Sequence, residues 1–125
     1  MTLSFENKVA LVTGAGSGMG LATALAFASA GAAVALVDIS EPAVRKVAEQ
    51  LVAAGHKAIA LTCDVTDEAQ VKRMIEQTVS AFGRLDAAFN NAGVQSIAVE
   101  TADSTAEEFD RVNAINLRSV WLCMK

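Results

Sequence analysis

The sequence predicts an α/β fold, in which a doubly wound parallel sheet is covered by helices on both faces. Short apolar runs alternate with segments whose apolar residues follow a helical period, in the order β-α-β-α-β-α-β-α. The runs are continuously hydrophobic, as in Val9–Thr13 and Ala33–Asp38, which is typical of strands buried on both faces of a parallel sheet. Because crossovers between parallel strands are right-handed, the expected strand order is 3-2-1-4.

Capping and turn residues set the expected bounds of these elements. Ser40 is expected to cap one helix, which has Pro42 in its first turn. Thr66 is expected to cap another, and a capping box of sequence Ser-Thr-Ala-Glu at 104–107 opens the last. The strands are therefore expected at Val9–Thr13, Ala33–Asp38, Ala58–Cys63 and Leu85–Asn90, and the helices at Met19–Ala30, 41–54, 67–82 and 105–125.

The first strand and the first helix are joined by a glycine-rich turn, TGAGSGMG. This turn lies at the switch point between strands 1 and 4, where open α/β sheets bind ligands. Gly14 can adopt a tight turn, Gly18 lets the backbone approach a ligand, and Gly20 is expected to let the helix pack on the sheet. The helix begins there with free N–H groups and about half a positive charge, which suits a pyrophosphate. A purely structural role for these glycines is the alternative.

Asp38, at the end of the second strand, indicates which dinucleotide would bind. Its carboxylate can accept both hydroxyls of an adenosine ribose. A 2′-phosphate at the same place would meet a like charge, which costs about 4 kcal/mol at 4 Å in a medium of ε ≈ 20. No basic residue stands at Ser17 or Ile39 to offset it. The sequence therefore predicts NAD, with NADP less favoured.

Composition argues against several other classes of protein. The net charge is −4 and no Lys/Arg cluster occurs, so neither nucleic acid nor a membrane surface is an expected partner. The charge-free run 9–37 is long enough to span a bilayer, but its glycines would break a spanning helix. The first residues do not resemble a secretory signal, so a cytoplasmic location is expected. Cys63 and Cys123 show neither metal spacing nor a disulfide framework, so no metal site is expected.

Four motifs together resemble the short-chain dehydrogenase/reductase family. TGAGSGMG is similar to the family's Thr-Gly-x-x-x-Gly-x-Gly, and CDV at 63–65 to its adenine-side segment. NNAG at 90–93 resembles its strand 4 signature. NAINL at 113–117 resembles its helix segment with a functional asparagine, which aligns with Asn116. They occur in the family's order over essentially the whole chain, which implies one NAD(P)-binding domain of Rossmann type over residues 1–125.

The resemblance also implies roles for individual residues. Asn116 would hold, through its backbone carbonyl, a water of a catalytic proton relay, and Asn90 would tie strand 4 to its neighbours. Asp64 would accept a hydrogen bond from the adenine amino group. Simpler roles stay open: Asn90 and Asn91 can form a strand-ending turn, and Asn116 can bond a helix end. The implied cofactor-binding residues are Gly14, Ser17, Gly18, Met19, Gly20, Asp38, Ile39, Asp64, Val65, Asn91, Ala92 and Gly93.

The chain departs from the family in one respect that bears on chemistry. The family's acid/base centre is a tyrosine, a lysine four residues later and an upstream serine, all beyond the segment that contains Asn116, and this sequence contains no tyrosine. A positioned acid or base typically contributes 10²–10⁴ in rate. The resemblance implies that the second half of the sheet is missing, with strand 4 an exposed edge. We expect a truncated chain, completed by a C-terminal segment or in trans; the resemblance also implies a homo-oligomer.

Two functions of different classes follow. The first is an NAD(H)-dependent oxidoreductase that transfers hydride between nicotinamide and a small-molecule alcohol/carbonyl substrate, with this chain supplying the dinucleotide-binding half. The second is a non-catalytic NAD-binding or assembly module. A methyltransferase that binds S-adenosylmethionine fits less well, because NNAG and the gap between Gly14 and Gly18 argue against it. A P-loop NTPase is excluded, because no Gly-Lys-Ser/Thr follows the glycines.

Overall fold

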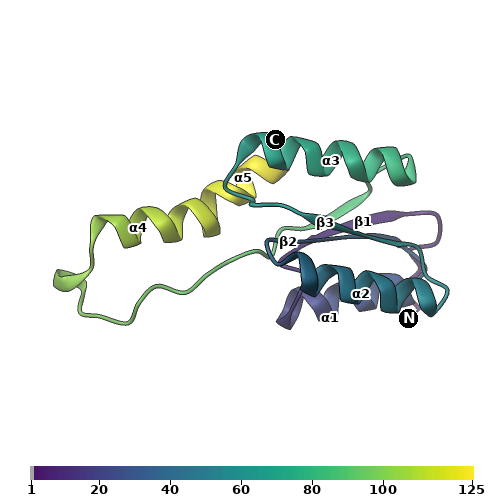
Figure 1. The fold of residues 1–125 in the computed structure, drawn as a ribbon, viewed down its shortest axis with the longest axis horizontal. Helices are drawn as coiled ribbons and strands as arrows, with labels where there is room; N and C mark the ends of the chain where they lie inside the picture. The colour runs from purple at the N-terminus through teal and green to yellow at the C-terminus, as the bar shows by residue number, and fades with distance from the viewer. Residues whose placement is uncertain (1) are drawn as a thin grey trace.

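The computed structural model describes residues 2–125 and confirms the predicted architecture. Strands and helices alternate along the chain. The last two helices, α4 and α5, follow one another in an arm whose α4 end projects away from the sheet (Figure 1). The strands are β1 (Val9–Thr13), β2 (Ala33–Asp38), β3 (Ala58–Thr62) and β4 (Ala87–Phe89). The helices are α1 (Gly18–Ser29), α2 (Glu41–Ala53), α3 (Glu68–Phe82), α4 (Ala106–Asn113) and α5 (Ser119–Met124).

The four strands form one parallel sheet in the predicted order, β3-β2-β1-β4. Leu11 in β1 pairs with Ala35 on one side and with Ala88 on the other. The order reverses at β1, because β2 and β3 extend to one side of it and β4 lies on the other. The carboxyl ends of β1 and β4 therefore border a switch point, the place where open α/β sheets bind ligands.

Helices cover both faces of the sheet, with α1 and α2 on one face and α3 and α5 on the other (Figure 1). Alternation along β1 divides its residues between two apolar cores. Ala10 and Val12 face the core with α1 and α2, whereas Leu11 faces the core that contains Met74 of α3 and Leu122 of α5. Burial on both faces explains why the strands are continuously hydrophobic.

Several element bounds differ from the sequence prediction. Asp67, not Thr66, caps α3, because its side chain accepts the Gln70 N–H. Thr105, not Ser104, caps α4, because its side chain accepts the Glu108 N–H. Strands β3 and β4 are shorter than expected, and the expected last helix is divided by a π-helical segment, Ala114–Arg118.

The segment between β4 and α4 is long and irregular, apart from a 3₁₀ turn at Thr101–Asp103. Helix α4 stands away from the sheet, and α5 returns beside α3 (Figure 1). None of the helices within residues 2–125 combines the length and the apolar character needed to cross a membrane. The charge-free run 9–37 instead forms β1, the glycine turn, α1 and most of β2.

Core packing gives a first prediction. Leu36 in β2 is fully buried, whereas Leu25 on α1 is 41% exposed. We expect Leu36→Ala to lower the free energy of unfolding by about 2–5 kcal/mol, because it leaves a cavity in the core, and Leu25→Ala to lower it by less than about 1 kcal/mol. Urea unfolding followed by circular dichroism measures both values. Equal losses for the two variants would show that β2 is not buried as described.

Candidate functional site

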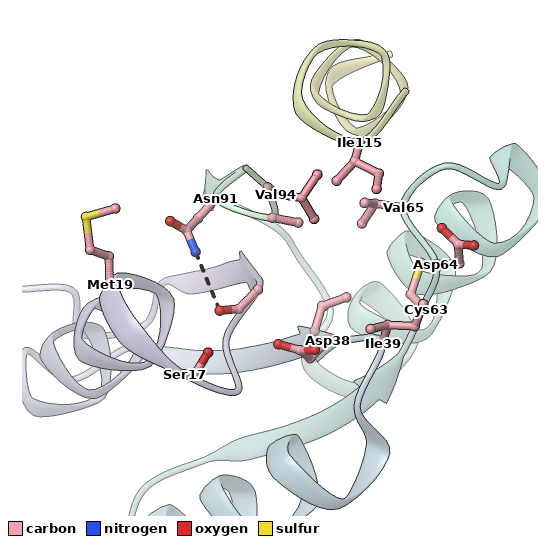
Figure 2. Close-up of a pocket in the computed structure, with 14 residues that line it drawn as sticks. Ser17, Met19, Asp38, Ile39, Cys63, Asp64, Val65, Asn91, Val94 and Ile115 are labelled. Atoms are coloured by element: carbon pink, nitrogen blue, oxygen red, sulfur yellow. Dashed lines mark hydrogen bonds between the residues drawn. The ribbon is translucent and has the colours of Figure 1, made fainter. Parts of the chain in front are cut away.

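A cavity of about 540 Å³ opens at the carboxyl ends of the strands, where the switch point lies (Figure 2). It collects residues from the carboxyl ends of the strands, from the segments that follow all four of them and from the π-helical segment. The predicted site residues in its wall are Gly14, Ser17, Met19, Asp38, Ile39, Asp64, Val65, Asn91, Ala92 and Gly93. Gly18, Gly20 and Asn116 are outside the wall.

The glycine turn is shaped by close contacts between backbone segments. Gly14 has a φ of 65° and Gly18 a φ of 55°, which L side chains rarely adopt. A Cβ on Gly20 would lie 2.0 Å from the Gly14 carbonyl oxygen and 2.7 Å from the Asn91 amide nitrogen. Gly20 therefore packs against the turn and the residue after β4. Gly14 directly follows β1 and Asn91 follows β4, so this contact lies at the carboxyl end of the sheet.

The amino end of α1 faces this cavity without a neutralising partner. The N-cap residue Ser17 makes no side-chain capping bond, and the first turn of α1 carries no acidic residue. The first N–H groups of a helix have no intrahelical acceptor. They leave a partial positive charge beside Gly14 and Met19, where an anionic group can be held by backbone N–H donors.

Asp38 is fixed at the cavity wall by two backbone donors. Its Oδ2 accepts the Gly16 N–H at 2.9 Å, and its Oδ1 accepts the Ser40 N–H at 3.0 Å. Each carboxylate oxygen can accept a further hydrogen bond, so the group can still bind a diol. A Cβ on Gly16 would lie 2.9 Å from both Asp38 Oδ2 and Ala43 Cβ. Gly16, the second of the four glycines in the turn, was not among the predicted site residues.

The end of β1 and the loop after β4 are joined through Thr13. Its buried hydroxyl accepts the N–H of Asn91 at 2.9 Å and that of Ala92 at 3.0 Å. The Asn91 side chain donates back to the carbonyl of Thr13, at 3.2 Å, and to that of Gly14, at 3.5 Å (Figure 2). Asn91 thus makes the connection expected of Asn90. The buried Oδ1 of Asn90 has no partner among residues 2–125, so the role expected of Asn90 is not seen there.

The far wall of the cavity is apolar. Sequence reasoning missed four of its residues, which are Val37, Cys63, Val94 and Ile115. Val65, Val94 and Ile115 converge from three different segments (Figure 2). Burial is the main cause that raises the pKa of Cys63 to about 11, so its thiol is neutral at physiological pH and acts as an apolar wall. The sequence carries two signals for this apolar wall: Cys63 belongs to the CDV motif, and Ile115 belongs to the apolar face of the predicted last helix.

Asn116 connects the π-helical segment to the loop after β4. Its Oδ1 accepts the Val94 N–H and its Nδ2 donates to the Val94 carbonyl, each at 2.7 Å. Farther along the same loop, Glu108 accepts the Ile97 N–H, and Arg111 donates to the Gln95 carbonyl. These contacts place Val94 at the cavity, so Asn116 acts on the wall from behind. The proton-relay role of its backbone carbonyl stays a prediction.

The cavity can bind but offers few groups for proton transfer. Its ionisable side chains are the carboxylates of Asp38 and Asp64 and the neutral thiol of Cys63. The wall combines an anion-binding helix end, a carboxylate for a sugar and an apolar surface for a flat ring. This set fits a dinucleotide, whose pyrophosphate, ribose and base need these three environments.

Comparison with known proteins agrees with this interpretation. The model of the short chain dehydrogenase family matches residues 8–125. Levodione reductase from Leifsonia aquatica is 43% identical over 123 residues, which are 97% of this chain and 46% of that protein. The chain spans about half the length of the curated relatives it matches.

Solved structures show the same likeness. A 3-ketoacyl-(acyl-carrier-protein) reductase from Brucella melitensis, complexed with NADH, superposes with a TM-score of 0.91 at 40% identity, covering 97% of this chain and 49% of that one. A short-chain dehydrogenase/reductase from Burkholderia phymatum, in complex with NAD, gives 0.93 at 36%, covering 98% and 43%. The fold is thus that of a Rossmann-type nucleotide-binding protein. The chain belongs to the short-chain dehydrogenase family.

Two buried threonines test the connection through Thr13. Thr13→Val leaves the Ala92 N–H without an acceptor, which we expect to cost about 1–3 kcal/mol of unfolding free energy. Thr78→Val removes only a hydroxyl that donates to the Met74 carbonyl, an acceptor that keeps its helical bond, so we expect a loss below about 1 kcal/mol. Urea unfolding measures both. A Thr13→Val loss no larger than that of Thr78→Val would contradict the role given to Thr13.

Proposed function

We propose that this chain is the dinucleotide-binding half of an NAD(H)-dependent oxidoreductase that acts on a small-molecule alcohol/carbonyl pair. One observation carries the proposal: a single cavity unites the open amino end of α1, the fixed carboxylate of Asp38 and an apolar wall. Family membership adds that the chain's relatives are named dehydrogenases and reductases. The domain is proposed to comprise residues 1–125.

The residues present fit the proposed cofactor. A Cβ on Gly20 would lie 2.0 Å from the Gly14 carbonyl oxygen, so the absence of a side chain lets α1 begin directly against the turn, and no acidic residue of the first turn competes for the N–H groups of α1. When bound, the cofactor supplies the nicotinamide ring that accepts or donates hydride. The N–H groups of α1 would hold the pyrophosphate, Asp38 the adenosine ribose, and Ile39, Asp64 and Val65 the adenine. The backbone of Asn91, Ala92 and Gly93 would border the second ribose.

The preference for NAD over NADP is part of this proposal. Both oxygens of Asp38 are anchored by backbone N–H groups, so the carboxylate cannot easily turn away from a 2′-phosphate. The neighbouring wall residues Ser17 and Ile39 carry no positive charge. The two solved relatives named above, one in complex with NADH and the other with NAD, support a dinucleotide of this kind.

A second candidate is a non-catalytic NAD-binding or assembly module. The observation in its favour is the composition, because the sequence contains no tyrosine and the cavity wall contains no lysine or histidine. In the first candidate, Asn116 is the proposed contributor to a proton relay, through its backbone carbonyl. In the second, the same residue only positions Val94.

The free cysteines and the edge of the sheet bear on location and assembly. We propose a cytoplasmic location, because Cys63 and Cys123 are both free thiols, as is usual in a reducing compartment. We also propose association with a second copy or with a completing C-terminal segment, because one edge of β4 has no neighbouring strand within residues 2–125.

Calorimetric titration with NADH, run beside a hydride-transfer assay on a panel of alcohols, separates the two candidates. Binding with turnover supports the oxidoreductase. Binding without turnover leaves the module. No heat with either NADH or NADPH, on folded protein, would reject the oxidoreductase and the NAD-binding module and leave only an assembly role.

Substitution of Asp38 tests the proposed cofactor preference. We expect Asp38→Ala to reduce the ratio of NADH affinity to NADPH affinity by roughly tenfold or more, because removal of the carboxylate relieves its repulsion of a 2′-phosphate. Calorimetry with both dinucleotides gives the ratio. Asp38→Asn, which keeps an acceptor for one backbone N–H, should change it in the same direction.

Asp103 is an exposed acidic residue in the 3₁₀ turn. The variant Asp103→Ala is the matched control and should leave the ratio of NADH affinity to NADPH affinity unchanged. If both Asp38 variants keep the wild-type ratio, the account of cofactor preference is wrong.

A further inference from the structure

Asp64 is held in the cavity wall by hydrogen bonds with Thr66, which precedes α3, and with Gln70 in the first turn of α3. Its Oδ1 accepts the backbone N–H of Thr66 at 2.9 Å and the Thr66 hydroxyl at 2.7 Å. Its own backbone N–H donates to Oε1 of Gln70 at 2.9 Å. Within residues 2–125, Oδ2 of Asp64 receives no hydrogen bond. Asp64 is one of the residues that line the cavity (Figure 2), and this oxygen keeps its capacity to accept a hydrogen bond from a ligand.

The amide of Gln70 has only one orientation that satisfies its neighbours. Its Nε2 donates to Oδ2 of Asp67 at 3.3 Å, while Oε1 accepts from Asp64. The pKa of Asp67 is lowered, first because its carboxylate accepts the Gln70 backbone N–H, so the group is ionised at neutral pH. A reversed amide would set Nε2 against the Asp64 N–H and Oε1 against a carboxylate. Asp67 therefore orients Gln70, and Gln70 in turn fixes Asp64.

The side chain of Gln70 is not needed to begin α3. The helix has its own cap, because Oδ1 of Asp67 accepts the Gln70 backbone N–H at 3.1 Å. A change of the Gln70 side chain leaves that bond in place. The side chain instead reaches back to the loop that carries Asp64, so its loss acts on the cavity wall more than on the helix.

We propose that Gln70 is a positioning residue for recognition of the base: it holds Asp64 so that the free carboxylate oxygen selects a purine with an amino group at C6. This inference rests on the proposed function. An ionised carboxylate only accepts hydrogen bonds. It therefore binds the amino group of adenine and repels the carbonyl oxygen that hypoxanthine carries at the same position. Gln70 does not touch the base and acts only through the backbone of Asp64.

The test compares NADH with reduced nicotinamide hypoxanthine dinucleotide by calorimetry. We expect wild-type protein to bind NADH roughly tenfold more tightly, the scale of a hydrogen bond to a charged group. Gln70→Met keeps the side-chain length without its polar atoms, and should reduce this ratio by about threefold or more. Gln77→Met, at an exposed position on the same helix, is the matched control and should keep the wild-type ratio. A structural defect alone would lower the affinity for both dinucleotides equally and leave their ratio unchanged.

The outcomes separate this inference from the proposed function. If the wild type binds both dinucleotides equally, or if Gln70→Met keeps the wild-type ratio, the inference is wrong and the proposed function stands. If the wild type binds neither, both are wrong. Should Gln70→Met fail to fold, Gln70→Glu replaces it, because it keeps an acceptor for the Asp64 N–H but sets a carboxylate against Asp67. It should lower the ratio as well, and an unchanged ratio overturns the inference.

Discussion

The site depends on the contact between Gly20 and the carbonyl of Gly14. Because no side chain separates them, α1 begins directly against the turn that follows β1. The Asn91 amide occupies the same place and donates to the carbonyls of Thr13 and Gly14. One point of backbone packing therefore fixes three elements at once: the end of β1, the amino end of α1 and the loop after β4. The cavity is the space that these three elements leave between them.

Electrostatics follow from that packing. The amino end of α1 is directed at the cavity with its N–H groups uncapped by side chains, whereas Asp38 and Asp64 lie on the neighbouring strand ends. Positive and negative partial charges thus occupy separate parts of one wall. Each carboxylate is anchored by local backbone or hydroxyl donors, so neither can swing to neutralise the helix end. This separation is what a ligand with phosphates at its centre and a sugar and base to one side requires.

Sequence reasoning succeeded where the signal is local or periodic. The strands, their order and most of the cavity wall follow from continuous apolar runs, right-handed crossovers and strand-end motifs. It failed where neighbouring residues of the same chemistry compete. Thr66 and Asp67 can both cap α3. The Thr66 hydroxyl donates to Asp64 instead, and Asp67 accepts the Gln70 N–H as the cap. Val94 and Ile115 carry no motif, since only the folded loop and the π-helical segment bring them together.

The cavity wall carries groups suited to holding a ligand but few groups suited to proton transfer. Its carboxylates are already used as backbone anchors, and burial keeps the Cys63 thiol protonated, so the wall positions a ligand better than it moves a proton. Within residues 2–125, neither the Oδ1 of Asn90 nor the outer edge of β4 has a hydrogen-bonding partner, and Asn90 lies between β4 and Asn91. A group that completes this side would meet both an unsatisfied acceptor and a row of backbone donors and acceptors. Unsatisfied side-chain and backbone groups therefore gather on the β4 side of the cavity.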